Sequence, residues 1–264
     1  MFTIIKQKLK EQRNSVAVYI ASLVGYTFLM ISMFPSMKKM DIDALISSYP
    51  EDFAKFFGDS GMASFGTIEG FLSMEFFSLF FILITSFYIG SAAGSAIAGQ
   101  IEKRTMDFNL SQPISRTKLV LAEAITALFY SSLITVFVSS FTYLFCILFD
   151  VAISAKGIAN FTVIATLLIW ALYGIGLFLS SILKSKIGVM LLTVAFTLGS
   201  YVFLSLTRLV EKLQNLDMYS IFYLYDPEKL LRNTGFEYYQ IYVLLGVFAL
   251  GLAGSLIVFN RKDV

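Results

Sequence analysis

The sequence predicts an all-α integral membrane protein with six transmembrane helices. Hydrophobic residues make up 57% of the 264 residues, charged residues make up only 14%, and the mean hydropathy is +0.77. Soluble domains are closer to half apolar and a quarter charged. Six separate stretches are also long and apolar enough to cross a bilayer, which takes about 20 residues of α-helix. No linker or internal repeat interrupts them, so we expect residues 1–264 to form one transmembrane domain.

The six spans follow from apolar runs bounded by polar or charged residues. We place them at 15–34, 74–98, 119–149, 158–183, 187–206 and 238–259. The third and fourth are longer than a bilayer requires, so tilted or protruding ends are expected. Only residues 184–186 separate the fourth and fifth spans, which must therefore form a hairpin.

Residues 1–14 precede the first span and mix four cations with large apolar side chains. This pattern predicts either an interfacial helix whose cations face anionic headgroups or a solvated positive flank that sets the topology. It does not predict a signal peptide, because a full-length span follows it without a small-residue cleavage site.

The charges are distributed unevenly between the two sides of the predicted bundle. Six spans place both termini on one side, which holds 12 of the 20 Lys and Arg residues but only 5 of the 18 Asp and Glu residues. The other side holds 8 cations and 13 anions. Cytoplasmic loops of membrane proteins carry an excess of Lys and Arg. We therefore expect a multi-pass protein of the cytoplasmic membrane with both termini in the cytosol.

Two long loops are predicted on the outer side, at 35–73 and 209–237. Both place Phe or Tyr among acidic residues and are too apolar for free solvent, so we expect short interfacial or re-entrant helices there. In the second loop, Pro227 disfavours helical geometry at Asp226, which predicts a turn. A turn with a solvated Asp226 is favoured over an acid/base pair of Asp226 with Glu228.

The composition excludes several kinds of catalytic and metal site. The sequence has no His, and its one Cys, Cys146, lies in an apolar run. A disulfide framework, a Cys/His metal site and a His-based triad are therefore impossible. The sequence also lacks a Gly-rich phosphate loop followed by Lys. We expect no catalytic residue, metal or cofactor on this chain, and no nucleic-acid partner.

Charge is also absent from the predicted centre of the bilayer. The nearest ionisable residues, Glu75, Glu123 and Arg208, lie close to span ends, from which long side chains reach the interface. Proton- or sodium-driven transporters place a carboxylate or a broken helix at the midplane, and channels have a selectivity filter or a ring of charges. The pattern therefore argues against a secondary transporter, a pump and a channel.

Small residues recur every fourth position in the second span, at Gly90, Gly94 and Ala98. Such a stripe allows two helix backbones to approach closely in a membrane. We expect it to serve helix packing within the chain, with a contact between subunits or the lining of a conduit as alternatives.

The polar segment 99–118, between the second and third spans, carries the most informative pattern. Ala98-Gly-Gln-Ile-Glu-Lys-Arg-Thr105 and Leu110-Ser-Gln-Pro-Ile-Ser-Arg116 resemble the cytoplasmic loop of ATP-binding-cassette (ABC) permeases of the type-2 exporter family. That loop has a Glu and a Gly-Thr pair before Leu-Leu-Ser-x-Pro-Ile/Val-Ser-Arg. Arg104 stands where Gly is common, which predicts a different local backbone. The ending Phe259-Asn-Arg-Lys-Asp263 is also similar to the family's ending.

The resemblance implies an N-terminal interfacial helix, a cytoplasmic coupling helix and re-entrant helices before the last span. It also implies that this chain pairs with a second copy or a related permease and docks on two cytosolic ATPase subunits, which bind ATP and Mg²⁺. Phe108 and Leu110 would supply buried contacts to the ATPase. The full set of residues assigned to this contact is Glu102, Arg104, Thr105, Asp107, Phe108, Asn109, Leu110, Ser111, Gln112, Pro113, Ile114 and Arg116.

The expected function is therefore that of the permease subunit of an ATP-driven exporter. A conduit without buried charge, lined by Phe, Tyr, Leu and small residues, suits an amphipathic or hydrophobic substrate such as a peptide, an antimicrobial compound or a drug. The alternative is a membrane anchor or regulator of a cytosolic partner that transports nothing. Co-purification of an ATPase whose turnover responds to the chain separates the two.

Overall fold

The computed structural model describes residues 2–37, 66–104, 115–234 and 237–262, and every regular element in them is helical. The long helices are α1 (Phe2–Met37), α5 (Phe80–Ala96), α8 (Arg116–Leu148), α9 (Ala155–Ile182), α10 (Lys186–Leu209) and α12 (Tyr238–Arg261). The shorter elements are α4 (Ile68–Leu72), the π-helix η2 (Ser73–Phe77), α6 (Ala98–Glu102), the 3-10 helices η3 (Glu211–Tyr219) and η4 (Ile221–Leu224), and α11 (Pro227–Leu231).

Six segments of the described chain are long and apolar enough to cross a membrane. Each contains or closely matches one predicted span, which confirms the all-α membrane fold with six spans. A helix satisfies all its backbone hydrogen bonds internally, as a segment in a bilayer must. The predicted loop 35–73 lies mostly outside the described residues, whereas 209–237 contains η3, η4 and α11.

The first helix is longer than the predicted span. The sequence left open whether residues 1–14 form an interfacial helix or a solvated positive flank, and in the structure α1 runs without a break from Phe2 to Met37. No Pro occurs before Pro35 to interrupt its backbone hydrogen bonds. At a rise of about 1.5 Å per residue, a helix of 36 residues is much longer than the hydrocarbon core of about 30 Å. Its basic first part therefore continues the first span.

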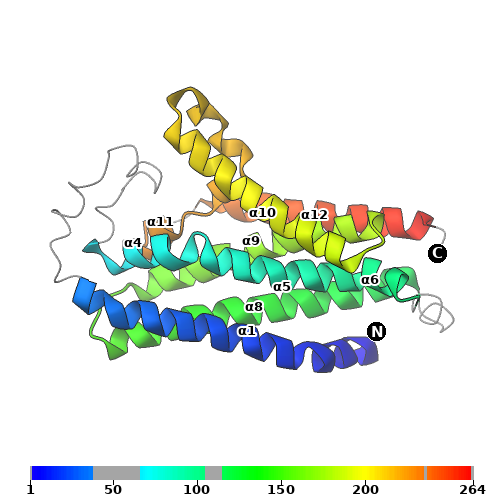
Figure 1. Ribbon diagram of the computed structural model, residues 1–264, viewed down its shortest axis with the longest axis horizontal. Helices are drawn as coiled ribbons and strands as arrows, with labels where there is room; N and C mark the ends of the chain where they lie inside the picture. Colours follow the sequence, from blue (N-terminus) through cyan, green and yellow to red (C-terminus); the bar gives the residue numbers. More distant parts are fainter. Residues whose placement is uncertain (1, 38–65, 105–114, 235–236, 263–264) are drawn as a thin grey trace.

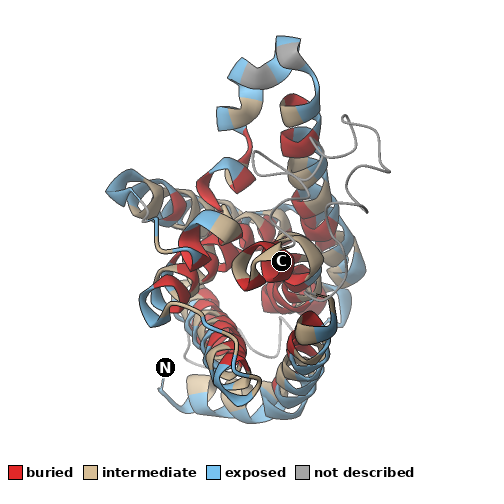
Figure 2. Ribbon diagram, turned by 90° about the vertical axis from the view of Figure 1, so that its left-hand side faces the viewer, coloured by how far each residue is buried: buried red, intermediate tan, exposed pale blue. Residues whose placement is uncertain are grey.

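The long helices run side by side and place both chain termini at one end of the bundle (Figure 1). We term this the terminal end, and the opposite end, with α4 and α11, the far end. Helix α9 packs against α12, α5, α8 and α10, while α1 packs along α8. The later part of α10 leaves the bundle and projects from it together with η3 (Figure 1). Buried residues lie on the sides of the helices that face each other (Figure 2).

The starts of three long helices follow from serine caps. Ser115, Ser154 and Ser185 precede α8, α9 and α10, and each hydroxyl accepts a hydrogen bond from the backbone N–H three residues later. Such a cap satisfies one of the free N–H groups of a first helical turn. Asp226 caps α11 in the same way, with Pro227 at the first helical position, so the chain turns before Pro227 as predicted.

The second span is a helix with two irregularities rather than the uniform helix expected over 74–98. It begins at Ile68, passes through the π-helix η2, and is broken again at Ile97, where φ is −129° and ψ is −62°. A π-helical turn leaves backbone carbonyls without their usual partners. Tyr225 meets this need, because its hydroxyl donates to the carbonyl oxygen of Phe77 over 3.0 Å.

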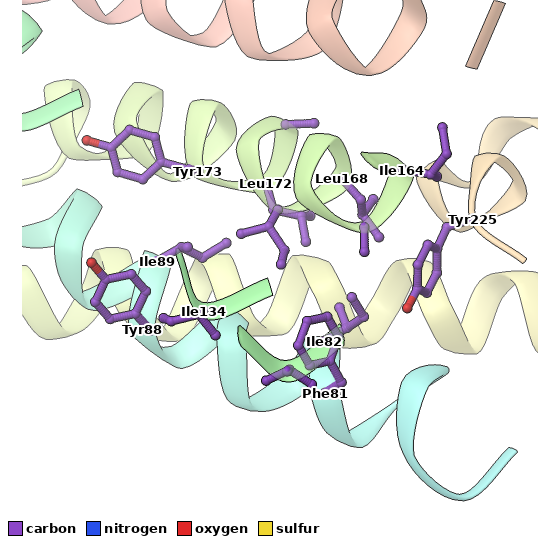
Figure 3. Packing of buried hydrophobic residues seen from close by; sticks show 14 of the residues in the cluster. Phe81, Ile82, Tyr88, Ile89, Ile134, Ile164, Leu168, Leu172, Tyr173 and Tyr225 are labelled. Carbon is purple, nitrogen blue, oxygen red and sulfur yellow. The ribbon is translucent and has the colours of Figure 1, made fainter. Parts of the chain in front are cut away.

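The core at the far end is aromatic. The ring of Phe161, from α9, lies 4.2 Å from that of Phe77 and 6.1 Å from those of Phe81 and Tyr225, measured between centroids. Figure 3 shows Phe81 and Tyr225 in this region, with aliphatic side chains of α5 and α9 continuing the packing toward Tyr88 and Tyr173. The aromatic cluster joins the π-helical turn of the second span to α9 and the chain after η4.

Candidate functional site

Three of the twelve residues assigned to the ATPase contact lie in the described chain, and all three are at the terminal end. Glu102 is the last residue of α6, Arg104 follows it closely, and Arg116 is the first residue of α8. The remaining nine, within 105–114, lie outside the described residues. The structure therefore describes the two flanks of the predicted coupling segment.

Glu102 binds the start of another helix. Its Oε2 atom accepts a hydrogen bond of 2.7 Å from the backbone N–H of Lys186, the first residue of α10. The first N–H groups of a helix have no partner within it, and the positive end of the helix dipole favours a carboxylate. Glu102 thus caps the N–H of Lys186, while Ser185 caps that of Gly188.

Arg116 binds the end of the last helix. Its Nη1 atom donates to the carbonyl oxygen of Phe259 over 3.0 Å and to that of Lys262 over 2.6 Å. Its guanidinium carbon also lies 5.4 Å from the centroid of the Phe259 ring, which permits a cation–π contact. The last carbonyl groups of a helix lack internal partners and attract a cation, so Arg116 joins α8 to the end of α12.

Lys262 extends this connection to α9. Its Nζ atom donates to the carbonyl oxygens of Ser181 and Ile182, over 2.9 and 3.1 Å, in the last turn of α9. Burial, and then the neighbouring charge of Lys184, lower the pKa of Lys262. The last turn of α9 is therefore bound to the end of α12 through Lys262, the C-cap residue of α12.

A fourth contact of this kind stabilises the break in the second span. The backbone N–H of Ala98, just after the break at Ile97, donates to the hydroxyl of Ser180 on α9 over 3.0 Å. We use the term cross-cap for such a bond, in which a side chain on one element binds a backbone group at the end of another. The cross-caps of the terminal end are made by Glu102, Arg116, Ser180 and Lys262.

Arg104 adopts a backbone conformation that glycine favours. Its φ is 54°, in the left-handed region that residues with a Cβ atom rarely enter. The sequence predicted that Arg at this position would alter the local backbone. In the structure, Arg104 occupies the left-handed conformation two residues after the end of α6.

A buried ion pair lies beside these contacts. The Nζ atom of Lys8 on α1 is 2.8 Å from the Oε1 atom of Glu123 on α8, and Gln100 also donates to that oxygen over 3.3 Å. Glu123 is 3% exposed, so the expectation that its side chain reaches the interface is wrong. The reason is the partner: burying a carboxylate is costly unless an opposite charge and hydrogen bonds compensate it.

Further bonds fasten the first third of α1 to the bundle. The Tyr88 hydroxyl on α5 donates to Oε1 of Gln12 over 3.1 Å, and the Tyr130 hydroxyl on α8 donates to the carbonyl oxygen of Leu9. With the Lys8–Glu123 pair, these bonds hold the basic part of α1 against α5 and α8. Lys8 therefore faces the protein, whereas the sequence suggested headgroups as its partners.

The small-residue stripe of the second span faces α10. A Cβ atom at Gly94 would lie 2.7 Å from the carbonyl oxygen of Lys186, and one at Gly90 would lie 3.1 Å from that of Met190. Ala98, the third member, is fully buried at the start of α6. The glycines thus permit close packing of α5 against the first turns of α10, beside the contact of Glu102 with Lys186.

Sequence reasoning missed Lys8, Ser180, Lys186 and Lys262 as parts of this arrangement. One signal was available: Glu123 is the only carboxylate inside the third span, and a charge in that position demands a partner. The cross-caps carried no such signal, because Ser180, Lys186 and Lys262 lie far from Glu102 and Arg116 in the sequence. Only the tertiary fold brings these helix ends together.

The contacts of the terminal end join helix ends to one another. The described residues contain no group of three or more His, Cys, Asp and Glu side chains that could hold a metal ion. At the far end, the Asp226 carboxylate caps α11 and pairs with Lys229 at 3.5 Å, while Glu228 pairs with Arg232 at 2.8 Å. Both carboxylates therefore have local structural partners.

Comparison with known proteins gives one match. The family model described as ABC-2 family transporter protein matches residues 3–264, nearly the whole chain. No curated protein and no solved structure matches the sequence or the fold. The match agrees with the six membrane-spanning helices and with the resemblance of segment 99–118. The chain therefore belongs to the ABC-2 family of transporter proteins.

Proposed function

We propose that this chain is the permease subunit of an ATP-driven exporter, whose separate ATPase subunits supply the energy for transport. The observation that carries the proposal is the family match over residues 3–264. A member of this family is a multi-pass membrane component of a transporter and works with an ATPase subunit. Export, rather than import, rests on the resemblance of segment 99–118 to the exporter loop.

The distribution of charge supports ATP as the energy source. Glu123, a carboxylate buried within the third span, pairs with Lys8 and lies about two turns from the start of α8. Ion-driven transporters use carboxylates that bind and release protons or cations near the midplane. A carboxylate held in an ion pair close to one end does not suit that role.

The terminal end is the proposed docking side for the ATPase. The excess of Lys and Arg there supports a cytosolic position for this end, because cytoplasmic loops are richer in these residues. Glu102 and Arg116, which flank segment 103–115 in the sequence, both lie at this end. We assign Thr105 and residues 107–114 of the loop to the ATPase contact, with Phe108 and Leu110 as the apolar part, while ATP and Mg²⁺ bind to the partner.

The proposed cargo is amphipathic or hydrophobic, such as a peptide, an antimicrobial compound or a drug. Side chains buried between the described helices are mainly aliphatic and aromatic, with hydroxyls among them. A pathway formed by separation of such surfaces favours apolar groups. Two copies of the chain, or this chain and a related permease, would form the pathway above two ATPase subunits.

The test is co-purification from the native membrane followed by ATP hydrolysis in liposomes. We expect a nucleotide-hydrolysing subunit to accompany the wild-type chain and its turnover to change when the chain is present. Phe108→Ala should weaken this association at least about tenfold, since loss of a buried aromatic anchor costs upwards of 1.4 kcal/mol. Phe2→Ala is the matched control, because Phe2 lies at the same end, 80% exposed, outside the segment.

Three outcomes are decisive. Loss of association in Phe108→Ala with normal association in Phe2→Ala supports the coupling segment as the docking site. Equal association in both variants contradicts that assignment. A partner without a nucleotide site, or no partner at all, favours the membrane anchor or regulator over the permease.

A further inference from the structure

We propose that Lys6, Lys10 and Arg13, which we term the basic stripe, bind the headgroup of an anionic phospholipid whose acyl chains lie along the apolar surface of α1 beyond them. The sequence left open whether the cations of residues 1–14 face headgroups or solvent. The structure separates these cations into one that binds the protein and three that stay outside. The inference concerns the three and is independent of what the chain transports.

The four cations in the first third of α1 have different surroundings. Lys8 is held by Glu123 on α8, at 2.8 Å, and by Glu11, at 3.7 Å. Glu11 also accepts a hydrogen bond of 3.0 Å from Gln7. The three residues of the basic stripe are exposed, and within the described chain none of them forms an ion pair with a carboxylate. The stripe is therefore available to an anion from outside the chain.

The basic stripe occupies one side of α1 and is held there. Its members are four and three residues apart, a spacing that places side chains on the same side of a helix. The rotation of α1 is fixed by the Lys8–Glu123 pair and by the bonds of Tyr88 and Tyr130. A rotation that turned the stripe inward would break these contacts. A site that is arranged before binding loses less freedom when the ligand arrives.

The stripe also lies at the depth of lipid headgroups on the terminal end. The first predicted span begins at Ser15. At a rise of about 1.5 Å per residue, Arg13 lies about 3 Å, Lys10 about 8 Å and Lys6 about 14 Å from that point along the helix. The headgroup layer on each side of a bilayer is about 5–8 Å thick. Arg13 and Lys10 therefore lie within this layer, and the long side chain of Lys6 extends toward it.

Beyond the stripe, the same side of α1 is apolar. Ala17 and Ala21 are exposed about one and two turns after Arg13, and Phe28 further along is 40% exposed. The small side chains leave the helix surface open to an acyl chain, which would continue from a headgroup bound at the stripe. A free phosphate ion would use the cations alone, whereas a phospholipid uses both surfaces. This continuity commits the site to a lipid.

The test measures the affinity of the purified chain for phosphatidylglycerol, which is anionic, and for phosphatidylcholine, which is zwitterionic. Native mass spectrometry in detergent counts the lipid molecules bound during each titration. Each cation near an anionic surface strengthens binding about fivefold. We therefore expect a variant with Lys6→Gln, Lys10→Gln and Arg13→Gln to bind phosphatidylglycerol at least about tenfold more weakly than wild type, with its affinity for phosphatidylcholine unchanged.

Two further variants control for charge and for fold. The first combines Lys103→Gln, Lys118→Gln and Lys184→Gln, which removes three exposed cations from the same end but outside α1. We expect its affinity for phosphatidylglycerol to stay within about twofold of wild type, because attraction between a cation and a headgroup falls off within a Debye length. The second combines Lys6→Arg, Lys10→Arg and Arg13→Lys, which keeps every charge of the stripe and should bind as wild type does.

Each of four results would overturn the inference. Equal losses in the two Gln variants would show a diffuse attraction to the charged end. Loss of binding in the charge-conserving variant would attribute the effect to damage of α1. Displacement of phosphatidylglycerol by an equal concentration of inorganic phosphate would make the stripe a site for free anions. Unchanged lipid affinity in the stripe variant, together with loss of a co-purifying ATPase, would make the stripe a contact to that partner.

The expected result is selective. Weaker binding of phosphatidylglycerol in the stripe variant alone, with normal binding in both controls, supports a phospholipid site on α1. This result holds whether or not an ATPase accompanies the chain, so the inference and the proposed function are tested separately.

Discussion

The two ends of the bundle are held together by different interactions. At the terminal end, charged side chains of one element bind the backbone ends of another, as Glu102, Arg116 and Lys262 do. At the far end, rings such as those of Phe161 and Phe77 fill the space between helices. Aromatic packing resists deformation in every direction, whereas a hydrogen bond to a helix end links two elements while allowing both to move together. The terminal end is thus joined by hydrogen bonds between helix ends, and the far end by packed aromatic rings.

The largest expected effect is on the aromatic cluster. Phe161→Ala should lower the free energy of unfolding by about 3–5 kcal/mol, because the side chain is fully buried and leaves a cavity among three other rings. Phe161→Leu should cost much less. Thermal unfolding in detergent measures both, and a small loss in Phe161→Ala would contradict the view of the far end as the rigid part.

The next largest effect on stability is expected at the buried ion pair of Lys8 with Glu123. Glu123→Ala removes the nearer of the two carboxylate partners of Lys8 and leaves Glu11 at 3.7 Å. It should cost about 3 kcal/mol, the lower part of the range for buried pairs, because Lys8 keeps this second partner and is 25% exposed. Lys8→Met combined with Glu123→Leu should recover most of the loss, since two apolar side chains replace two charges. The same unfolding assay distinguishes these variants. A double variant as unstable as Glu123→Ala would show that the charges themselves are needed.

Loss of the hydrogen bond from the Tyr225 hydroxyl to the Phe77 carbonyl should have a smaller effect on stability. Tyr225→Phe leaves the Phe77 carbonyl without its donor and should cost about 1–3 kcal/mol. Burial, and then the neighbouring Asp226, raise the pKa of Tyr225 well above its ordinary value of 10.0. Folding therefore favours the neutral form of Tyr225. The stability that this residue contributes is complete below pH 10.0 and is lost as the pH rises above 10.0.

The free energy of unfolding, measured as a function of pH above 10.0, tests whether this loss of stability occurs. The wild-type chain should lose stability above pH 10.0 more steeply than Tyr225→Phe, which has no group to ionise at this position. Parallel curves for the two proteins would refute the role of Tyr225 in this loss.

The smallest expected effect is a gain in stability from a substitution at the terminal end. Arg104→Gly relieves a left-handed backbone conformation, with φ of 54°, at the cost of greater freedom in the unfolded chain. The net gain in unfolding free energy should be about 1 kcal/mol or less. Co-purification with the ATPase should stay unchanged, because the backbone keeps its course. A loss of stability in this variant would indicate that the Arg104 side chain makes a needed contact.

Composition and periodicity alone predicted the membrane class, the six spans and the hairpin at 184–186. These features depend on local runs of apolar residues, since a bilayer selects long apolar helices whatever their neighbours are. The turn before Pro227 was equally local, because the proline ring restricts the residue before it. The family followed from about twenty residues around segment 99–118, and the match over 3–264 confirms it.

Only the tertiary structure decided what the charged residues at the terminal end bind. Arg116 meets residues 143 and 146 positions away, and Glu102 meets Lys186 across 84 positions, so no local pattern records these partners. The inward direction of Lys8 and the attachment of the first third of α1 were likewise set by Glu123, Tyr88 and Tyr130. The sequence determined which segments are helices, and the fold determined which helix ends meet, because free backbone groups take the nearest partner that packing provides.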